Sequence, residues 1–527
     1  MSSVLSHLLP RMSGRLVAGG LLAASLAAIV GACSATLDFT ECLDDNDCAK
    51  FFEDNQPMFC DGNVCKVRDG GCDSNSQCAG LGAQFICTNS ATTRVCEATD
   101  VDGCEAPIYP GGEMADDVVF TGLMLPKTGA DKVLGADMEK AALAAFADFN
   151  KSGALQSGDK VATVVCDTKS DPTAAVAAAK HLGDRLTVPV FIGPVDDLEF
   201  TRVVDEVTFA PRVNAFTMGP MVTAALDGLD TGDLVFSAMP GAKFQGAALG
   251  RRIGGEYGGD MSANLLLVFS FDAYGEALYD ATATMSTGAG KPKRIPDLPG
   301  AQAVKSFTSV DEASSFLEDN VGGAWGVPNV LVLFGRSEVG EILKRYKAAG
   351  FAWPERIFVS QRSMAAVAAL ADASLAGVVV AIAPDLETAK LAALRTRIGQ
   401  PSLSAEAALA YDATMSSLLA MAAVKAGGPV VGLPVAKAVT KLADKTGVAV
   451  DFGEAPSKFV PAAVEAFKAG KGVDIAGITG ALDFDAEGEV CGPIGAFTLD
   501  ATGGKWTKVA TYTPACPDTA GTWADVP

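Results

Sequence analysis

Short runs of β-branched residues alternate with helical stretches from Asp116 onward, and this alternation constrains the fold more than any other feature of the chain. In the first series we expect a strand at 117–125, a helix at 137–150, a strand at 160–166, a helix at 172–182, a strand at 188–193 and a helix at 198–207. A second series has strands at 264–270, 330–335 and 356–360, each followed by an Ala-rich or amphipathic helix. Alternation of this kind requires crossover connections, so each series predicts a mostly parallel sheet with helices on both faces.

The length of the chain, 527 residues, exceeds what one hydrophobic core can organise. The two series therefore predict an α/β protein with two doubly wound, Rossmann-like lobes. We expect lobe 1 at residues 116–240 together with about 385–480, and lobe 2 at residues 241–384 together with about 481–515. The last residues, 516–527, are expected to be a tail.

Residues 1–32 have the pattern of an export signal. Arg11 and Arg15 precede an apolar run at 16–30, which is too short to span a bilayer comfortably and ends in small residues before Cys33. The segment resembles a bacterial lipobox, which implies that Cys33 becomes the lipidated first residue. A buried N-terminal helix is the alternative, but nothing caps the run and basic residues flank only its front. We therefore expect an exported protein that a lipid anchors in the bacterial envelope, in the periplasm or at the outer membrane or cell surface.

Thirteen cysteines are present, and the twelve that remain after Cys33 are an even number, which favours disulfides in an exported chain. Eight of them form two quartets that each begin with C-x5-C: Cys42, Cys48, Cys60 and Cys65, then Cys72, Cys78, Cys87 and Cys96. We expect a Cys-rich module at 33–110 with two disulfide-stapled repeats, because so few apolar residues could not hold a core without crosslinks.

The pairing of the other four cysteines stays open at this point. Cys104 needs a partner among Cys166, Cys491 and Cys516. The spacing does not choose among them, although a bridge from Cys491 to Cys516 would close one C-terminal loop and leave Cys166 for Cys104. Zinc is the alternative for the Cys-rich module, but no histidine lies there and no C-x2-C pair occurs, so we expect no metal site.

The formal charge of −22 disfavours nucleic acid as a partner and argues against binding to anionic lipid headgroups, so the lipid anchor is the expected membrane contact. An enzyme is the weakest hypothesis. His181 is the only histidine after the signal segment, which excludes histidine-based triads and multi-histidine metal sites. The sequence contains no G-x-x-x-x-G-K-[ST] loop and no G-x-S-x-G elbow. We expect no catalytic residues and no cofactor.

Short motifs in a fixed order carry a resemblance that covers about residues 116–513. They are TGLMLPKTG at 121–129, LGAD at 134–137, DFN at 148–150, CD at 166–167, DPTAAV at 171–176, FIGP at 191–194, YGE at 274–276, YDA at 411–413 and ITGALDFD at 478–485. Each is weak alone, but their order resembles the branched-chain amino-acid (Leu/Ile/Val) binding protein family, which has the type I periplasmic binding fold. The resemblance implies two α/β lobes, joined by three crossovers, that close like jaws on a small solute.

Ligands of open α/β sheets bind beyond the carboxyl ends of the strands, so the turns between strands and helices supply the candidate ligand-binding residues. Helix N-termini at these turns add unpaired amides. The candidates are Thr128, Asp196, Asp197, Thr217, Met218, Tyr274, Arg336 and Arg362. Each type also has a structural explanation, since an aspartate can cap a helix, a tyrosine can pack under a loop and an arginine can be solvated.

Two candidates depart from what the resemblance implies. Amino-acid binders of this family hold the ligand carboxylate with small hydroxyls and backbone amides near the turn where this chain has Asp197. They hold the ligand ammonium with an acidic residue near the turn where it has Arg362. Both signs are reversed, which disfavours an aliphatic amino acid in the usual pose. Tyr274 is retained where family members often place an aromatic wall.

Two functions of different classes fit these observations. In the first, the chain is a solute-binding protein of the kind that serves ABC transporters, with an importer permease or another envelope protein as partner. Arg336 and Arg362 would then present donors to a small amino-acid-like or acidic ligand. In the second, it is a periplasmic or cell-surface interaction protein whose cleft no longer binds a small molecule, a hypothesis that the extra Cys-rich module favours.

Overall fold

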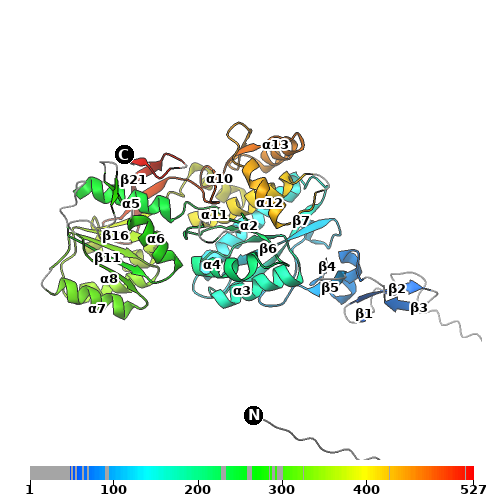
Figure 1. Cartoon of the computed structure of the whole chain (residues 1–527), viewed down its shortest axis with the longest axis horizontal. Helices are drawn as coiled ribbons and strands as arrows, with labels where there is room; N and C mark the ends of the chain where they lie inside the picture. The colour runs from blue at the N-terminus through cyan, green and yellow to red at the C-terminus, as the bar shows by residue number, and fades with distance from the viewer. Residues whose placement is uncertain are drawn as a thin grey trace, which may run out of the picture.

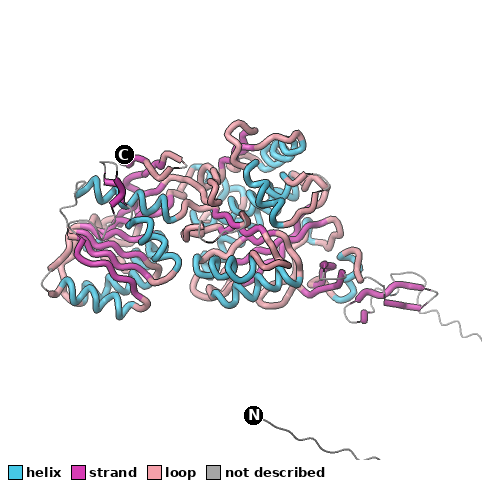
Figure 2. The backbone as a smooth tube through the Cα atoms, viewed as in Figure 1, coloured by secondary structure: helices cyan, strands magenta, loops and turns pink. Residues whose placement is uncertain are grey.

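The computed structural model describes residues 48, 52–53, 56–61, 64–67, 71–89, 94–226, 229, 233–257, 264–283, 285–287, 291–293, 301–323, 326–425, 428–516 and 518–526. They form two α/β lobes, with a disulfide-rich region beside lobe 1 (Figure 1). In each lobe a sheet lies between layers of helices (Figure 2). The expected pair of doubly wound lobes is confirmed.

Lobe 1 is built on a parallel sheet with the strand order β10-β9-β8-β6-β7. Its strands are β6 (Val118–Leu125), β7 (Lys160–Asp167), β8 (Val190–Ile192), β9 (Phe216–Gly219) and β10 (Val235–Ser237). Helices α2 (Lys132–Ser152), α3 (Pro172–Lys180) and α4 (Asp197–Val203) follow the first three strands. Helices on both faces bury most of the sheet, which explains why its strands are continuous apolar runs in the sequence.

The chain later returns to lobe 1. This part comprises α10 (Ala389–Arg397), α11 (Ala405–Ala423), α12 (Gly432–Ala438), α13 (Pro456–Lys468) and a small parallel sheet of β18 (Val448–Asp451) and β19 (Val473–Ala476). Helix α11 is buried on all sides from Ala407 to Ala423 and packs along α2. Its Tyr411 donates a hydrogen bond to Asp148 of α2 at 2.8 Å. The Ala-rich sequence of α11 fits this central place, because small side chains let neighbouring helices approach closely.

Lobe 2 has a sheet with the strand order β14-β11-β15-β16-β17-β20-β21-β22, in which the first five strands are parallel and the last three are antiparallel. The parallel strands are β11 (Leu265–Ser270), β14 (Ala301–Phe307), β15 (Val330–Phe334), β16 (Arg356–Ser360) and β17 (Val379–Pro384). Its helices are α5 (Ala242–Tyr257), α6 (Ala273–Ala283), α7 (Val310–Val321), α8 (Glu338–Ala348) and α9 (Met364–Ala369). A short hairpin of β12 (Met285–Thr287) and β13 (Lys291–Lys293) precedes β14.

The C-terminal residues differ from the expected tail. They follow β20 (Ile494–Leu499) and β21 (Trp506–Pro514), and form the edge strand β22 (Gly521–Asp525). Trp523 of β22 packs on Tyr512 of β21, with ring centroids 5.5 Å apart. A disulfide from Cys491 to Cys516 holds the turn that precedes β22. The alternating pattern of such an edge strand is too short to distinguish it from a tail in the sequence.

The three segments that connect the lobes lie together. Pro240 of the first segment and Val490 of the third form a parallel β-bridge. In the second segment, the amide of Asp385 donates to the carbonyl of Pro493 at 3.0 Å. Lys243, just after the first segment, lies 3.1 Å from Glu489 in the third. The lobes are therefore joined at one place. Away from this place, the carboxyl ends of the strands of the two lobes can face each other.

Two local expectations need correction. Helix α2 begins at Lys132, five residues before the expected start, so it extends to the turn after β6. Thr217 and Met218 lie inside strand β9, so the turn expected at these residues is wrong. Asn214 has a φ of 43°, a left-handed conformation that ends the preceding loop before the strand begins. The turn follows β9 instead.

The disulfide-rich region contains two hairpins with one arrangement. Strands β2 (Gln56–Asp61) and β3 (Val64–Val67), preceded by β1 (Phe52–Glu53), set Cys60 opposite Cys65 in register. Strands β4 (Phe85–Asn89) and β5 (Arg94–Ala98) set Cys87 opposite Cys96 in the same way. The described disulfides are Cys48–Cys65, Cys72–Cys87 and Cys78–Cys96. The second cysteine therefore pairs with the fourth in both quartets.

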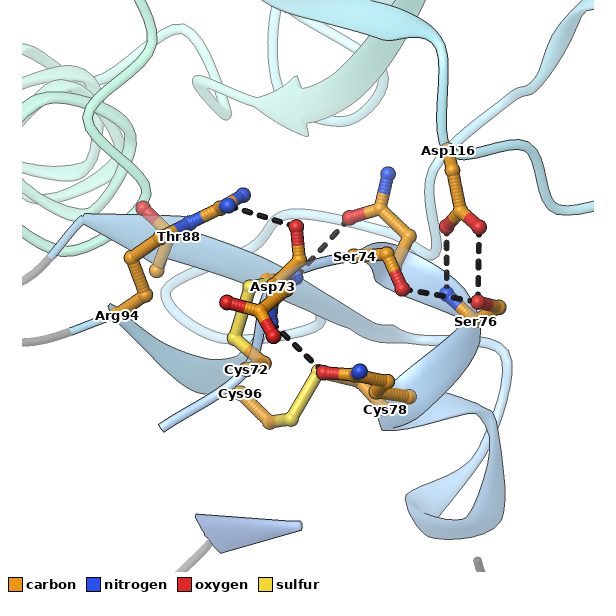
Figure 3. Close-up of a disulfide and its surroundings, with 12 residues drawn as sticks. Cys72, Asp73, Ser74, Ser76, Cys78, Thr88, Arg94, Cys96 and Asp116 are labelled. Carbon is orange, nitrogen blue, oxygen red and sulfur yellow. Dashed lines mark hydrogen bonds between the residues drawn. A yellow bond between two sulfur atoms is a disulfide. The ribbon is translucent and has the colours of Figure 1, made fainter. Parts of the chain in front are cut away.

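These disulfides also bear on the metal alternative. The sulfur atoms of Cys72, Cys78 and Cys87 lie within 4.8 Å of one another. All three belong to disulfides, as Figure 3 shows for the bond from Cys78 to Cys96. A disulfide sulfur is not a thiolate, so this group has no ligand to offer zinc.

The second disulfide-stapled repeat, residues 72–96, is tied to lobe 1. The amide and hydroxyl of Ser76 donate to the carboxylate of Asp116 at 2.7 and 2.8 Å (Figure 3). Thr88 donates to the carbonyl of Leu186 at 2.8 Å. Cys104 forms its disulfide with Cys166 in β7, which resolves the choice that the cysteine spacing left open.

In the described part of the chain, no helix combines the length and the apolar character needed to cross a bilayer. The expected export signal and the expected lipidation site at Cys33 lie outside the described residues.

Candidate binding cleft

The two sheets share one switch point in their strand order. In lobe 1 the first strand, β6, lies between the second, β7, and the third, β8; in lobe 2 β11 lies in the same way between β14 and β15. Ligands of such sheets bind in the crevice beyond the first and third strands. The turns after β8 and β15 carry Asp196, Asp197 and Arg336, so candidates from both lobes lie at this crevice.

Two adjacent aspartates form the lobe 1 side of the cleft. Asp196 caps helix α4 by accepting a hydrogen bond from the amide of Leu198 at 2.9 Å. Asp197 is completely buried and accepts from the amides of Thr223 and Ala224, both at 2.6 Å. Burial raises the pKa of Asp197. At Asp196 burial acts in the same direction, but the charges of Arg362 and Arg336 outweigh it and lower the pKa, so Asp196 is an anion at neutral pH.

The side chain of Arg336 reaches from lobe 2 to the carboxylate of Asp196 in lobe 1. Its Nε and Nη2 atoms both lie 3.0 Å from Oδ2 of Asp196. Its Nη1 donates at 2.5 Å to Asp272, which belongs to the same lobe as Arg336. Although burial by itself lowers the pKa of Arg336, the charges of the two aspartates raise it above its ordinary value. The guanidinium therefore stays charged and bridges the lobes.

Arg362 makes the second crossing. Its Nη2 donates to the carbonyl oxygens of Val195 and Met221 in lobe 1, at 2.8 and 3.2 Å. Its guanidinium nitrogens lie 3.7 Å from Asp196 and 3.6 Å from Asp197. The side chain is only 6% exposed, so this contact between charges is largely shielded from water.

Tyr274 supports both arginines from lobe 2. Its fully buried ring lies under the guanidinium groups, with centroid distances of 5.1 Å to Arg336 and 5.8 Å to Arg362. Its hydroxyl accepts from the backbone amide of Arg362 at 3.2 Å. Burial raises the pKa of Tyr274 to about 12, so the hydroxyl is neutral. The aromatic side chain thus holds the two arginines beside each other.

Five of the eight sequence candidates therefore come together, and three do not. Asp196, Asp197, Tyr274, Arg336 and Arg362, with the added Asp272, are called the ion-pair cluster below. Thr128 is exposed, and its amide and hydroxyl donate to Asp167. Thr217 is buried in β9 with its hydroxyl 3.1 Å from that of Thr208, and Met218 belongs to the lobe 1 core.

Two residues of this region, one of them a member of the cluster, were not among the eight candidate ligand-binding residues. Asp272 accepts from the amides of Tyr274 and Gly275 at 3.0 Å, and its place after β11 at the start of α6 repeats that of Asp196 after β8. That repetition could have identified it. Glu199 lies in the first turn of α4 and is 1% exposed. Burial, reinforced by the charge of Asp196, raises the pKa of Glu199 to about 8. A glutamate in the first turn of a helix is normally exposed to solvent, so nothing in the sequence indicated that Glu199 is buried.

A cavity of about 360 Å³ adjoins the cluster on the side of Arg362. Lobe 1 supplies the start of α2, including Val133 and Leu134, together with Met221, and lobe 2 supplies Gln361, Arg362 and Met364. This cavity, called chamber 1 below, is of the size that small-molecule sites have, and its lining combines apolar side chains with a few polar ones.

The family model "Periplasmic binding protein" matches residues 119–462. The chain belongs to the periplasmic binding protein family. Members of this family are non-enzymatic binding proteins, and family membership implies a location outside the cytoplasm. A comparison with curated protein sequences gives no significant match.

Solved structures of periplasmic binding proteins share the fold at low identity. The isoleucine complex of LivJ, a branched-chain amino acid transporter substrate-binding protein from Streptococcus pneumoniae, is 16% identical, with 78% of this chain and 100% of that chain covered and a TM-score of 0.54. A leucine-binding protein LivK from Thermotoga maritima is 16% identical, with coverages of 75% and 99% and a TM-score of 0.56. An ABC transporter solute-binding protein from R. palustris in complex with benzoate is 18% identical, with coverages of 74% and 95% and a TM-score of 0.51. These identities show the type I binding fold and leave the ligand of this chain open.

Proposed function

We propose that this protein is an extracytoplasmic solute-binding lipoprotein whose two lobes close on a small organic molecule in chamber 1. The observation that carries the proposal is the position of the cavity, which lies beside the ion-pair cluster and is lined by both lobes, after β6 in lobe 1 and after β16 in lobe 2. Solved relatives hold isoleucine or benzoate, so the fold accommodates ligands of this size. A lipid on Cys33 would anchor the protein, and an importer permease would be its natural partner.

The ion-pair cluster changes where such a ligand would lie. In the amino-acid binders that this sequence resembles, the ligand carboxylate lies near the position of Asp197 and the ligand ammonium near that of Arg362. Here a carboxylate and a guanidinium of the protein occupy both positions, 3.6 Å apart. A zwitterion in that pose would have to displace this pair, and an acidic ligand would have to compete with the aspartates for both arginines. We therefore assign the ligand to chamber 1 rather than to the cluster itself.

The alternative function is an envelope interaction protein, and one observation favours it. Arg336 and Arg362 contact acceptors of the opposite lobe, so side chains of the protein itself bridge the cleft. A protein whose cleft is bridged in this way could use its outer surface, and the disulfide-rich region beside it, to bind another protein of the envelope.

Thermal melting of the full mature chain without its lipid separates the two functions. The panel contains amino acids, dicarboxylates, aromatic carboxylates, amines and short peptides. A solute-binding protein gains about 2.7 kcal/mol when the ligand is present at 100 times its Kd, so its melting temperature rises with ligand concentration. Ala365→Trp, at an exposed position that lines chamber 1, should abolish that rise. Ala369→Trp, exposed on the same helix and outside the chamber, should leave it intact. A melting temperature unchanged by every compound favours the interaction protein.

A further inference from the structure

Chamber 1 is not a closed pocket, because a second cavity continues it. This second cavity, of about 390 Å³ and called chamber 2 below, shares Gln361, Met364, Ser404 and Glu406 with chamber 1. It runs past the end of β17 to Phe497 of β20 and Trp506 of β21. The site assigned above is therefore one end of a longer groove.

The charged residues that line chamber 1 are mostly carboxylates. Its lining includes three carboxylates, Asp131, Asp137 and Glu406, and a single cation, Arg362. The charge of Arg362 already faces two aspartates of the ion-pair cluster. Among the described residues, Asp137 pairs with Lys140 at 3.1 Å, whereas Asp131 and Glu406 have no ion-pair partner. Chamber 1 therefore has an excess of negative charge, which attracts a cationic group and repels a carboxylate.

More than half of the residues that line chamber 2 are apolar, and apart from Glu406, which it shares with chamber 1, its charges cancel. Its one cation, Arg395, lies 3.2 Å from Glu387 and donates to the carbonyl of Leu403 at 2.8 Å, so its charge and its donors are used within the protein. The indole N–H of Trp506, its only side-chain donor, donates to the carbonyl of Met364 at 2.9 Å. What chamber 2 offers a ligand is thus the apolar surface of side chains such as Leu386 and Trp506.

A methionine, Met364, lies where the two chambers meet, and a second methionine lines chamber 1. Met364 lines both of them, and Met221 lines chamber 1 from the opposite lobe. Methionine side chains are unbranched and flexible, so they adapt to apolar chains of different shape. An apolar group that leaves chamber 1 can therefore pass Met364 into chamber 2.

We propose that the ligand of this protein is an elongated organic cation, with an ammonium head near Asp131 and Glu406 in chamber 1 and an apolar tail that extends past Met364 to Trp506 in chamber 2. This inference deepens the proposed function and rests on it. The ammonium head would pair with the carboxylates of Asp131 and Glu406, which have no ion-pair partner among the described residues. The tail would cover the apolar side chains of chamber 2 and shield them from water. A free aliphatic amino acid is too short to use both chambers.

Titration calorimetry of the full mature chain with n-alkylammonium ions, from butyl to decyl, tests the proposal. Each added methylene should tighten binding roughly two- to four-fold, because each buries more apolar surface, until the tail reaches the end of chamber 2. The n-alkanoates of the same lengths should bind more weakly, because the carboxylates of chamber 1 repel them.

Matched variants separate the two ends of the ligand. Ala405→Phe narrows chamber 2 and should remove the gain for long tails while short ions bind as before. Ser402→Phe, at an exposed position in the same lining, repeats the test if Ala405→Phe does not fold. Ala392→Phe, exposed on α10 and outside both chambers, is the control. Glu406→Gln should weaken ions of every length by the same factor.

The outcomes are distinct. Affinity that rises with tail length and stops rising in Ala405→Phe supports the proposal. Affinity that is independent of length, or higher for alkanoates, overturns it while solute binding stands. Alkylammonium ions that do not bind, beside another compound that raises the melting temperature, overturn it as well. If no compound of either experiment binds, the proposed function fails together with the inference.

Discussion

The two faces of the cleft carry opposite charges and are held in different ways. On the lobe 1 face, Asp196 and Asp197 accept hydrogen bonds from backbone amides of their own lobe. On the lobe 2 face, Arg362 donates to carbonyls of the opposite lobe, and Arg336 divides its contacts between the lobes. If the lobes part, the aspartates keep their amide donors, whereas Arg362 loses its described acceptors. The free energy that keeps the cleft closed therefore resides mainly in the arginines.

The largest expected effect follows from removing Arg362. Arg362→Ala leaves Asp197 buried without its cation and should lower the free energy of unfolding by about 3–5 kcal/mol. The lobes should also open, which small-angle scattering would detect as a larger radius of gyration. Arg345→Ala, on the surface of α8 and 41% exposed, should leave the free energy of unfolding nearly unchanged. Equal effects of the two changes would remove the distinction between the faces.

Glu199 is a further buried carboxyl on the lobe 1 side, and the pH dependence of stability tests what its ionisation costs. Its pKa rises from an ordinary value of 4.5 to about 8, so the folded protein keeps a proton that the unfolded chain releases between these values. Stability should therefore fall as the pH rises through this window and level off above it. Glu199→Gln should flatten this slope in urea unfolding measured at several pH values. A slope that persists in the variant would assign the proton to another group.

Arg336 should matter less than Arg362, because its side chain is 23% exposed and it keeps a partner in its own lobe. Arg336→Ala should lower the free energy of unfolding by roughly 1.5 kcal/mol, the lower end for hydrogen bonds to charged groups. Chemical denaturation beside Arg362→Ala measures the difference. A larger loss for Arg336→Ala would reverse the order of the two arginines.

Tyr274→Phe has the smallest expected effect and tests whether the hydroxyl or the ring of Tyr274 supports the two arginines. The phenyl ring keeps the contact with both guanidinium groups, and only the hydrogen bonds of the hydroxyl, with the Arg362 amide and the Ser360 side chain, are lost. We expect a loss of about 0.5–1.5 kcal/mol in the free energy of unfolding. Tyr274→Leu, which also removes the aromatic face, should cost more. Identical values for the two variants would show that the ring does not support the arginines.

Much of the fold could be predicted from the residues because its signals are local. Strands buried on both faces appear as continuous apolar runs, and the helix that contains Met138, Ala142 and Phe149 shows its buried face in the spacing of these residues. Part of the site could be predicted for the same reason, since Asp196 and Arg336 follow buried strands closely. Thr217 and Met218 were misplaced because a short strand buried on both faces looks the same whether it begins before or after Asn214.

The sequence by itself thus determined that two doubly wound lobes form and that polar residues stand at the ends of their strands, since periodicity and turn chemistry act over a few residues. Only the tertiary structure decided that these polar residues neutralise one another. The contact between Arg362 and Val195 spans 167 positions in the chain and depends on how three connecting segments orient the lobes. The same orientation joins chamber 1 to chamber 2, because the packing of distant segments, and not any local pattern, shapes the space between lobes.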